Sequence, residues 1–274
     1  MSNFRVFLLK HRFLATLLLG TPFAIIYGLL AFTSNASPIM IVLVVAASYL
    51  IGIAASGTSL VTKPSRAAIT SLENCDPYPL LRLMEFCLTL RHSKMSKQIY
   101  TINLAAALSS LGEHERMYAV LKEMDIDGEA GVVPQTRFYY YNNLLAACHL
   151  LGKYEEASVY HDKLLKAAKH IKKEKAQARL YPMLLNADGD AAYRRGEYEE
   201  AVRFYDSALS AQGTAVTRRA TSHLYLDKAK ALLALEKREE ALPFLTAVRD
   251  GGTPNAKSEA ERLLASIDEA QIES

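Results

Sequence analysis

The chain has 274 residues, of which 50% are hydrophobic and 22% are charged, and its formal net charge at pH 7 is only +3. This length provides an ordinary core for one or two domains, and the small net charge favours no particular class of partner. The three widely spaced cysteines, Cys75, Cys87 and Cys148, match neither a disulfide framework nor a zinc motif, and they indicate a reducing compartment.

Two uncharged apolar segments near the N-terminus span residues 13–32 and 39–61. An α-helix rises about 1.5 Å per residue, so about 20 residues match a hydrocarbon core about 30 Å thick. We therefore expect two transmembrane helices within a membrane anchor formed by residues 1–66. Neither segment contains an ionisable residue, which argues against an ion path through them.

Basic residues flank the outer sides of this pair, at Arg5, Lys10, Arg12, Lys63 and Arg66. Positive charge favours the cytoplasmic side, so we expect both flanks and the C-terminal region in the cytoplasm. This pattern predicts a multi-pass protein of the cytoplasmic membrane. The alternative for the first segment is a cleaved signal peptide with a cleavage site at residues 34–36, although about 20 apolar residues exceed the usual 7 to 15.

Small residues recur at every fourth position of both segments: Thr16, Gly20, Ala24 and Gly28 in the first, and Ser48, Gly52 and Ser56 in the second. In lipid, small residues allow two helix backbones to approach closely. The two stripes are therefore expected either to pack against each other or to form a homo-oligomer. Pro22 is expected to bend the first helix, because proline removes a backbone donor.

From residue 71 onward, apolar residues recur at three- and four-residue steps, which predicts an all-α domain over residues 67–274. Its first amphipathic helix is expected at residues 76–91. Glycine and proline within residues 125–135 indicate a loop. A last amphipathic helix, over residues 254–270, is expected to cap the C-terminal end.

Four similar heptapeptides mark an internal repeat: LGEHERM at 111–117, LGKYEEA at 151–157, RGEYEEA at 195–201 and LEKREEA at 235–241. Each heptapeptide closes one apolar helix pattern and opens another. Glycine suits the turn, and acidic residues favour the N-terminal end of the following helix. The starts lie 40, 44 and 40 residues apart, so the pattern predicts a stack of similar helical hairpins.

These residues resemble the tetratricopeptide repeat (TPR) family, in which small and aromatic residues occupy fixed positions in each hairpin. The third repeat matches best, through Gly189, Gly196, Tyr198, Ala201, Tyr205, Ala208 and Leu209. The resemblance covers residues 97–250 and implies an α-α superhelix. Met117 replaces the small alanine in the first repeat and Glu236 the turn glycine in the fourth, and the repeats exceed the family's usual 34 residues.

The TPR resemblance implies a concave surface that holds an extended peptide or a partner helix. Asn103 and Asn143 occupy equivalent positions on the first helices of two repeats, where their amides could hold a peptide backbone. They are our candidate partner-binding residues. The alternative is that they are polar positions between packed leucines. The family's clamp for a C-terminal carboxylate requires more basic residues than these helices carry.

Four lysines, Lys163, Lys166, Lys169 and Lys173, are expected to form one basic stripe along a helix. Such a stripe is either a solvated face or a surface for anionic lipid headgroups, which attract each nearby basic residue by about 1 kcal/mol. Nucleic-acid binding is not expected, because no aromatic residues alternate with these lysines.

The chain lacks the sequence patterns of catalytic, metal and cofactor sites. Its seven histidines form no HExxH motif, no phosphate-binding glycine loop is present, and residues 186–190 lack the ligands of a calcium loop. We therefore expect no cofactor and no enzyme activity. The sequence predicts a TPR-type adaptor at the inner face of a bacterial cytoplasmic membrane; the alternative is an accessory subunit of a membrane enzyme or transporter.

Overall fold

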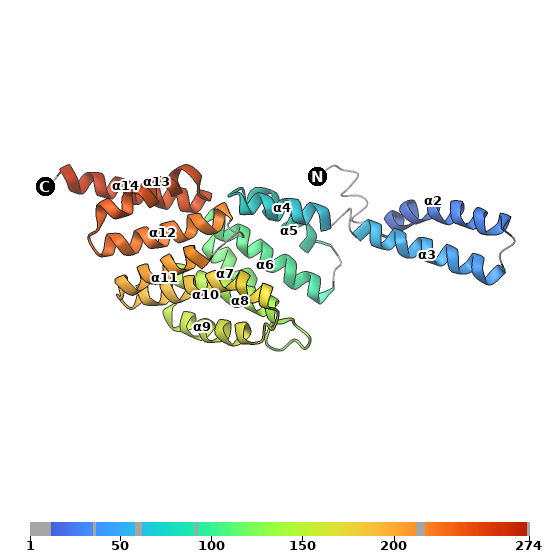
Figure 1. The fold of residues 1–274 in the computed structure, drawn as a ribbon, viewed down its shortest axis with the longest axis horizontal. Helices are drawn as coiled ribbons and strands as arrows, with labels where there is room; N and C mark the ends of the chain where they lie inside the picture. The colour runs from blue at the N-terminus through green and yellow to red at the C-terminus, as the bar shows by residue number, and fades with distance from the viewer. Residues whose placement is uncertain (1–11, 35–36, 58–61, 91–92, 212–216, 273–274) are drawn as a thin grey trace. The chain divides into compact units, whose positions relative to one another are not determined.

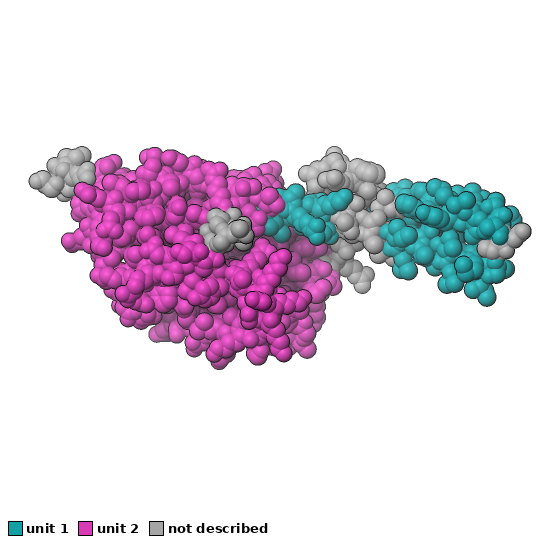
Figure 2. Space-filling model, viewed as in Figure 1, with its two compact units in different colours: residues 1–69 teal, residues 70–274 magenta. Residues whose placement is uncertain are grey.

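The computed structural model describes residues 12–34, 37–57, 62–90, 93–211 and 217–272. Within these ranges the regular structure is entirely helical, with no β-strand, which confirms the all-α prediction (Figure 1). The chain divides into two compact units, Met1–Ile69 and Thr70–Ser274 (Figure 2). Helix α4 (Lys63–Glu73) includes the boundary between them.

The first unit contains two packed apolar helices, α2 (Arg12–Thr33) and α3 (Pro38–Gly57). Among the described residues, only the part of α2 over Leu14–Thr33 is long and apolar enough to cross a membrane, and Pro38–Ile51 of α3 is a shorter apolar helix. The expectation of two spanning segments is thus supported for the first segment alone. Residues 58–61, which belong to the second predicted segment, lie outside the described residues.

Small residues of α2 face α3. A Cβ atom added to Gly20 would lie 3.0 Å from the Tyr49 ring and 3.3 Å from the Ser48 carbonyl oxygen, and Ser48 is itself 2% exposed. The two stripes therefore pack against each other here. The predicted homo-oligomer remains a prediction. Helix α2 continues through Pro22.

The second unit contains four helical hairpins with turns at the four predicted positions. They are α6 (Lys94–Leu111) with α7 (His114–Lys122), α8 (Pro134–Leu150) with α9 (Tyr154–Lys169), α10 (Glu174–Arg194) with α11 (Tyr198–Ala211), and α12 (Arg218–Ala234) with α13 (Arg238–Gly251). The predicted loop lies between α7 and α8. The TPR-like stack of hairpins is therefore present.

The turn position has the same left-handed backbone in every hairpin. Gly112, Gly152 and Gly196 have φ angles of 82°, 70° and 79°, and Glu236 has a φ of 60°. A side chain disfavours this conformation by about 1–2 kcal/mol. The fourth repeat therefore retains the turn geometry without the residue that suits it.

Single helices cover the two ends of the stack. Helix α5 (Tyr78–Leu88) packs against α6, and it begins two residues later than predicted, since Pro77 is the N-cap. Helix α14 (Pro254–Ile272) packs against α13, as expected for a closing cap.

The first helices of the hairpins form one layer, because α6 contacts α8, α8 contacts α10, and α10 contacts α12. Helix α14 contacts both α12 and α6, so the C-terminal cap reaches the first hairpin. Helix α12 also reaches α6 directly, because the Arg219 Nε on α12 donates a hydrogen bond to the Ser110 Oγ on α6 over 3.0 Å. The first and last helices of this first-helix layer, α6 and α12, are therefore both in contact with α14.

Candidate partner-binding site on the first-helix layer

The two asparagines selected from the sequence lie in this layer, and both are partly buried. The Asn143 Nδ2 on α8 donates a hydrogen bond to the Ile102 carbonyl oxygen on α6 over 3.3 Å. This amide therefore links two repeats in the structure. Asn103 lies on α6, four residues after Ile99, whose side chain is 44% exposed.

The expected continuous stripe of four lysines is wrong at its C-terminal end. Helix α9 ends at Lys169, and Lys173 is the N-cap of α10, so the two do not share one helix. Lys163 is also engaged: its Nζ lies 2.5 Å from the Asp127 Oδ2. Of the four lysines, Lys166 and Lys169 are the exposed ones on α9, and contact with lipid headgroups remains a prediction.

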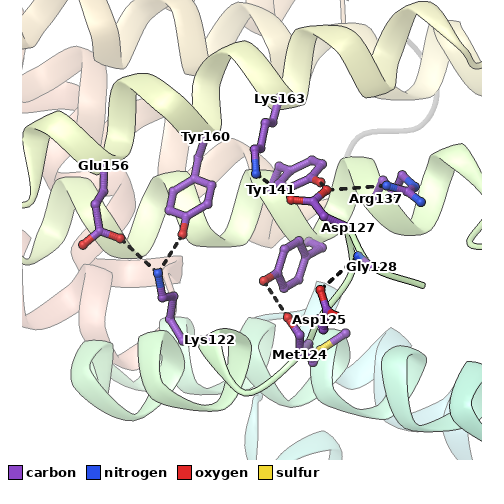
Figure 3. A network of polar contacts seen from close by, with 11 residues as sticks. Lys122, Met124, Asp125, Asp127, Gly128, Arg137, Tyr141, Glu156, Tyr160 and Lys163 are labelled. Atoms are coloured by element: carbon purple, nitrogen blue, oxygen red, sulfur yellow. Dashed lines mark hydrogen bonds and ion pairs between the residues drawn. The ribbon is translucent and has the colours of Figure 1, made fainter.

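The contact of Lys163 belongs to a polar network that joins the first two hairpins (Figure 3). The Lys122 Nζ on α7 donates hydrogen bonds to Glu156 and Tyr160 on α9, over 3.3 and 3.1 Å. Asp127, in the loop before α8, accepts a hydrogen bond from Tyr141. Every polar group in these contacts has a protein partner, so the network holds the loop and the hairpins together.

A second set of polar residues, which we call the polar cluster, lies on the first helices without such complete pairing. It comprises His149 on α8, Asn186, Asp190 and Arg194 on α10, and His223, Asp227 and Lys230 on α12. Four-residue steps place the three α10 members on one helix face. All except the exposed Arg194 are partly buried.

Asp190 is fixed by the hairpin to which it belongs. Its Oδ1 accepts a hydrogen bond of 2.9 Å from the hydroxyl of Tyr205, whose side chain is 1% exposed. The Tyr205 ring packs on Gly189, where an added Cβ would lie 2.6 Å from the ring. The Asp190 side chain nevertheless keeps 26% of its surface exposed, so a ligand group can reach it.

Both carboxyl groups of the polar cluster sit in an environment that disfavours their charge. Burial raises the pKa of Asp227 to about 6. Burial, followed by repulsion from Asp227, raises the pKa of Asp190 well above its ordinary value. No lysine or arginine nitrogen of the described residues lies within 4.0 Å of either carboxylate. Arg194 and Lys230 act on both groups only from a greater distance, where they partly offset the rise in pKa, so neither carboxyl group has a direct ion-pair partner within the described ranges.

The histidines of the polar cluster are neutral bases. Burial, with smaller effects from Arg194 and His161, lowers the pKa of His149 to about 4. Burial likewise lowers the pKa of His223 to about 3. Both rings are uncharged at neutral pH, so they offer hydrogen-bonding nitrogens without adding positive charge.

Several atoms of the polar cluster are buried without a hydrogen-bond partner. Among the described residues these are the His149 Nδ1, the Asn186 Oδ1 and the His223 Nε2. A buried polar group left unsatisfied costs about 1–3 kcal/mol, so such groups mark places where a ligand completes the pairing. The described residues provide no group of three His, Cys, Asp or Glu side chains that could hold a metal ion.

Sequence reasoning missed the polar cluster. The available signal was the polar residue at every fourth position of a first helix, visible as Asn186, Asp190 and Arg194. In the structure, residues 186–190 lie inside α10.

Comparisons with known proteins bear on the fold. No protein-family model and no curated protein sequence matches the chain. The chain is similar to the crystal structure of Bacillus thuringiensis PlcR in complex with the peptide PapR7 and DNA, with a TM-score of 0.53 and 15% identity over 85% of this chain and 84% of that chain. At this identity the likeness shows the fold, which is a TPR-like helical repeat.

Proposed function

We propose that the chain is a membrane-anchored TPR-type adaptor that binds a protein or peptide partner on the first-helix layer. The observation that carries this proposal is the polar cluster, with two carboxyl groups that lack a lysine or arginine partner and with buried polar atoms that lack a hydrogen bond, among the described residues. The structural likeness to PlcR adds support, since that protein was crystallised with a peptide. The same structure contains DNA, so the comparison lends no support to our expectation that nucleic acid is not a partner.

The membrane anchor is supported by the exposure of α2. Only 18% of its most apolar stretch is buried, and Leu29 and Phe32 are 61% and 71% exposed. Apolar surface of this kind requires a cover, and a hydrocarbon core supplies it. Together with the flanking basic residues, this favours insertion with the repeats in the cytoplasm.

Site-specific photo-crosslinking in cells tests the partner-binding surface. A benzophenone amino acid placed at Ile99 or Asn103, on the first-helix layer, should yield crosslinked partner. The matched control is Ser207, which is exposed on the second helix α11. Crosslinking from Ser207 alone, or equally from all three sites, would contradict the assignment of the surface.

Exchange of the membrane anchor distinguishes an adaptor from the alternative function, an accessory subunit of a membrane enzyme or transporter. Replacing residues 1–66 with an unrelated two-helix anchor should preserve crosslinking from Ile99, because the adaptor needs the anchor only for location. Loss of crosslinking, with the exchanged protein still in the membrane, would favour an accessory subunit whose spans make the main contacts.

A further inference from the structure

We propose that the partner inserts a basic side chain, lysine or arginine, whose cationic group binds between the carboxylates of Asp190 and Asp227. This inference rests on the proposed function and deepens it, because it specifies the chemistry of the partner. Neither carboxylate has a cation within 4.0 Å among the described residues, and Asp190 is reachable from solvent. A direct ion-pair partner for these carboxyl groups therefore has to come from a bound molecule.

The hydrogen-bonding capacity of Asp190 is only partly used. Its Oδ1 accepts from the Tyr205 hydroxyl, whereas its Oδ2 lies 4.0 Å from the His149 Nδ1, too far for a hydrogen bond. A carboxylate offers about four acceptor positions. The Tyr205 contact holds the group in place while the other oxygen stays available to a donor.

Unsatisfied atoms beside the carboxylates point to the same kind of ligand. The His149 side chain is 10% exposed and its Nδ1 has no partner, and the Asn186 Oδ1, one turn before Asp190, also lacks one. Asn186 Oδ1 accepts only, and a neutral imidazole can accept at one nitrogen. Ammonium and guanidinium groups donate only, so they match this set of acceptors.

The resident cations do not fill this role. The Arg194 guanidinium donates to the Tyr154 hydroxyl over 3.3 Å and to the His149 carbonyl oxygen over 3.4 Å, and it lies over the Tyr154 ring. The Lys230 Nζ lies 3.2 Å from the Glu259 Oε1 on α14. Both cations lower the pKa of Asp190 and Asp227 from a distance, but their direct partners are Tyr154, His149 and Glu259, so the carboxyl groups remain available to a donor from a ligand.

Peptide selection against the full-length protein in nanodiscs tests the inference. The probe is a phage library of random heptapeptides, panned on the native protein and on the double variant D190N/D227N. The matched control is D162N, because Asp162 is exposed on α9, outside the polar cluster. Circular dichroism of each variant verifies that it is folded.

We expect the native protein and D162N to enrich peptides with one invariant lysine or arginine, and D190N/D227N to lose this preference. Replacing that residue with glutamine in a selected peptide should weaken binding to the native protein at least tenfold, as judged from removal of one partner of a buried ion pair. The same replacement should change binding to D190N/D227N by less than twofold.

The outcomes separate the two levels of the proposal. Enriched peptides that are acidic or that lack a basic residue would overturn the inference and leave peptide binding intact. A basic residue whose effect persists in D190N/D227N would also overturn it. Failure to enrich any peptide would contradict both the inference and the peptide-binding function.

Discussion

Asp227 allows a prediction in which stability and pH are linked with a defined sign. The folded protein raises the pKa of this carboxyl from the ordinary 3.8 to about 6. The folded state therefore holds the proton more tightly than the unfolded state, so stability is greater at low pH and falls as pH rises from about 4 to 6. We predict that D227N stabilises the protein above pH 7 and leaves stability nearly unchanged at pH 4.

The size of this effect follows from the pKa. The rise in the pKa of Asp227 from 3.8 to about 6 corresponds to at most about 3 kcal/mol of unfolding free energy. Coupling to Asp190 and access of water reduce this value, so we expect D227N to gain about 1–3 kcal/mol of stability at pH 7.5. For a domain of about 200 residues, each kcal/mol moves the Tm by roughly 2–4 °C.

Thermal unfolding of the full-length protein in detergent, followed by circular dichroism at pH 4.5 and 7.5, measures this gain. The control is D206N, because Asp206 is 51% exposed and bonded to Lys228 over 2.6 Å, and it should gain nothing at pH 7.5. A loss of stability in D227N at pH 7.5, or an equal gain at both pH values, would refute the reasoning.

Four further variants probe the repeat architecture. E236G should raise the free energy of unfolding by about 1 kcal/mol, because glycine tolerates the φ of 60° at this turn. G196A should lower it by about 1 kcal/mol, because the added Cβ meets nothing within 4 Å and only the backbone is strained. Urea midpoints measure both changes, and opposite signs would contradict the turn geometry. G189A should cost about 1–3 kcal/mol, because the Cβ would lie 2.6 Å from the buried Tyr205 ring, and an unchanged Tm would exclude that close contact. D127A should speed amide hydrogen exchange in the loop before α8, because Asp127 binds Tyr141 and Lys163, and unchanged exchange would show that these contacts do not hold the loop.

The hairpin stack could be predicted because its signals are local. The turn at Gly196 lies between two apolar helix patterns, and the sequence on each side determines where α10 ends and α11 begins. Even Glu236, which departs from the pattern, occupies the predicted turn, because the flanking helices impose the backbone angle there. The exact helix ends were less predictable: α9 stops at Lys169, which separates that residue from Lys173.

The candidate site could not be predicted in the same way. Asp190 and Asp227 belong to different hairpins, and they approach each other only because α10 packs beside α12 in the first-helix layer. Spacing within one helix suggests which residues share a face, but it does not specify which faces meet. Asn143 illustrates the limit, since its amide donates to the neighbouring repeat.

The contact between α14 and α6 has a consequence for folding. In an open repeat array each repeat touches only its neighbours, so unfolding can start at one end and leave the other end folded. Here the two ends of the array touch, so the loss of one hairpin would separate α14 from α6 and expose surface on both. This contact couples the first hairpin to the C-terminal cap, so the described array should unfold as one cooperative unit.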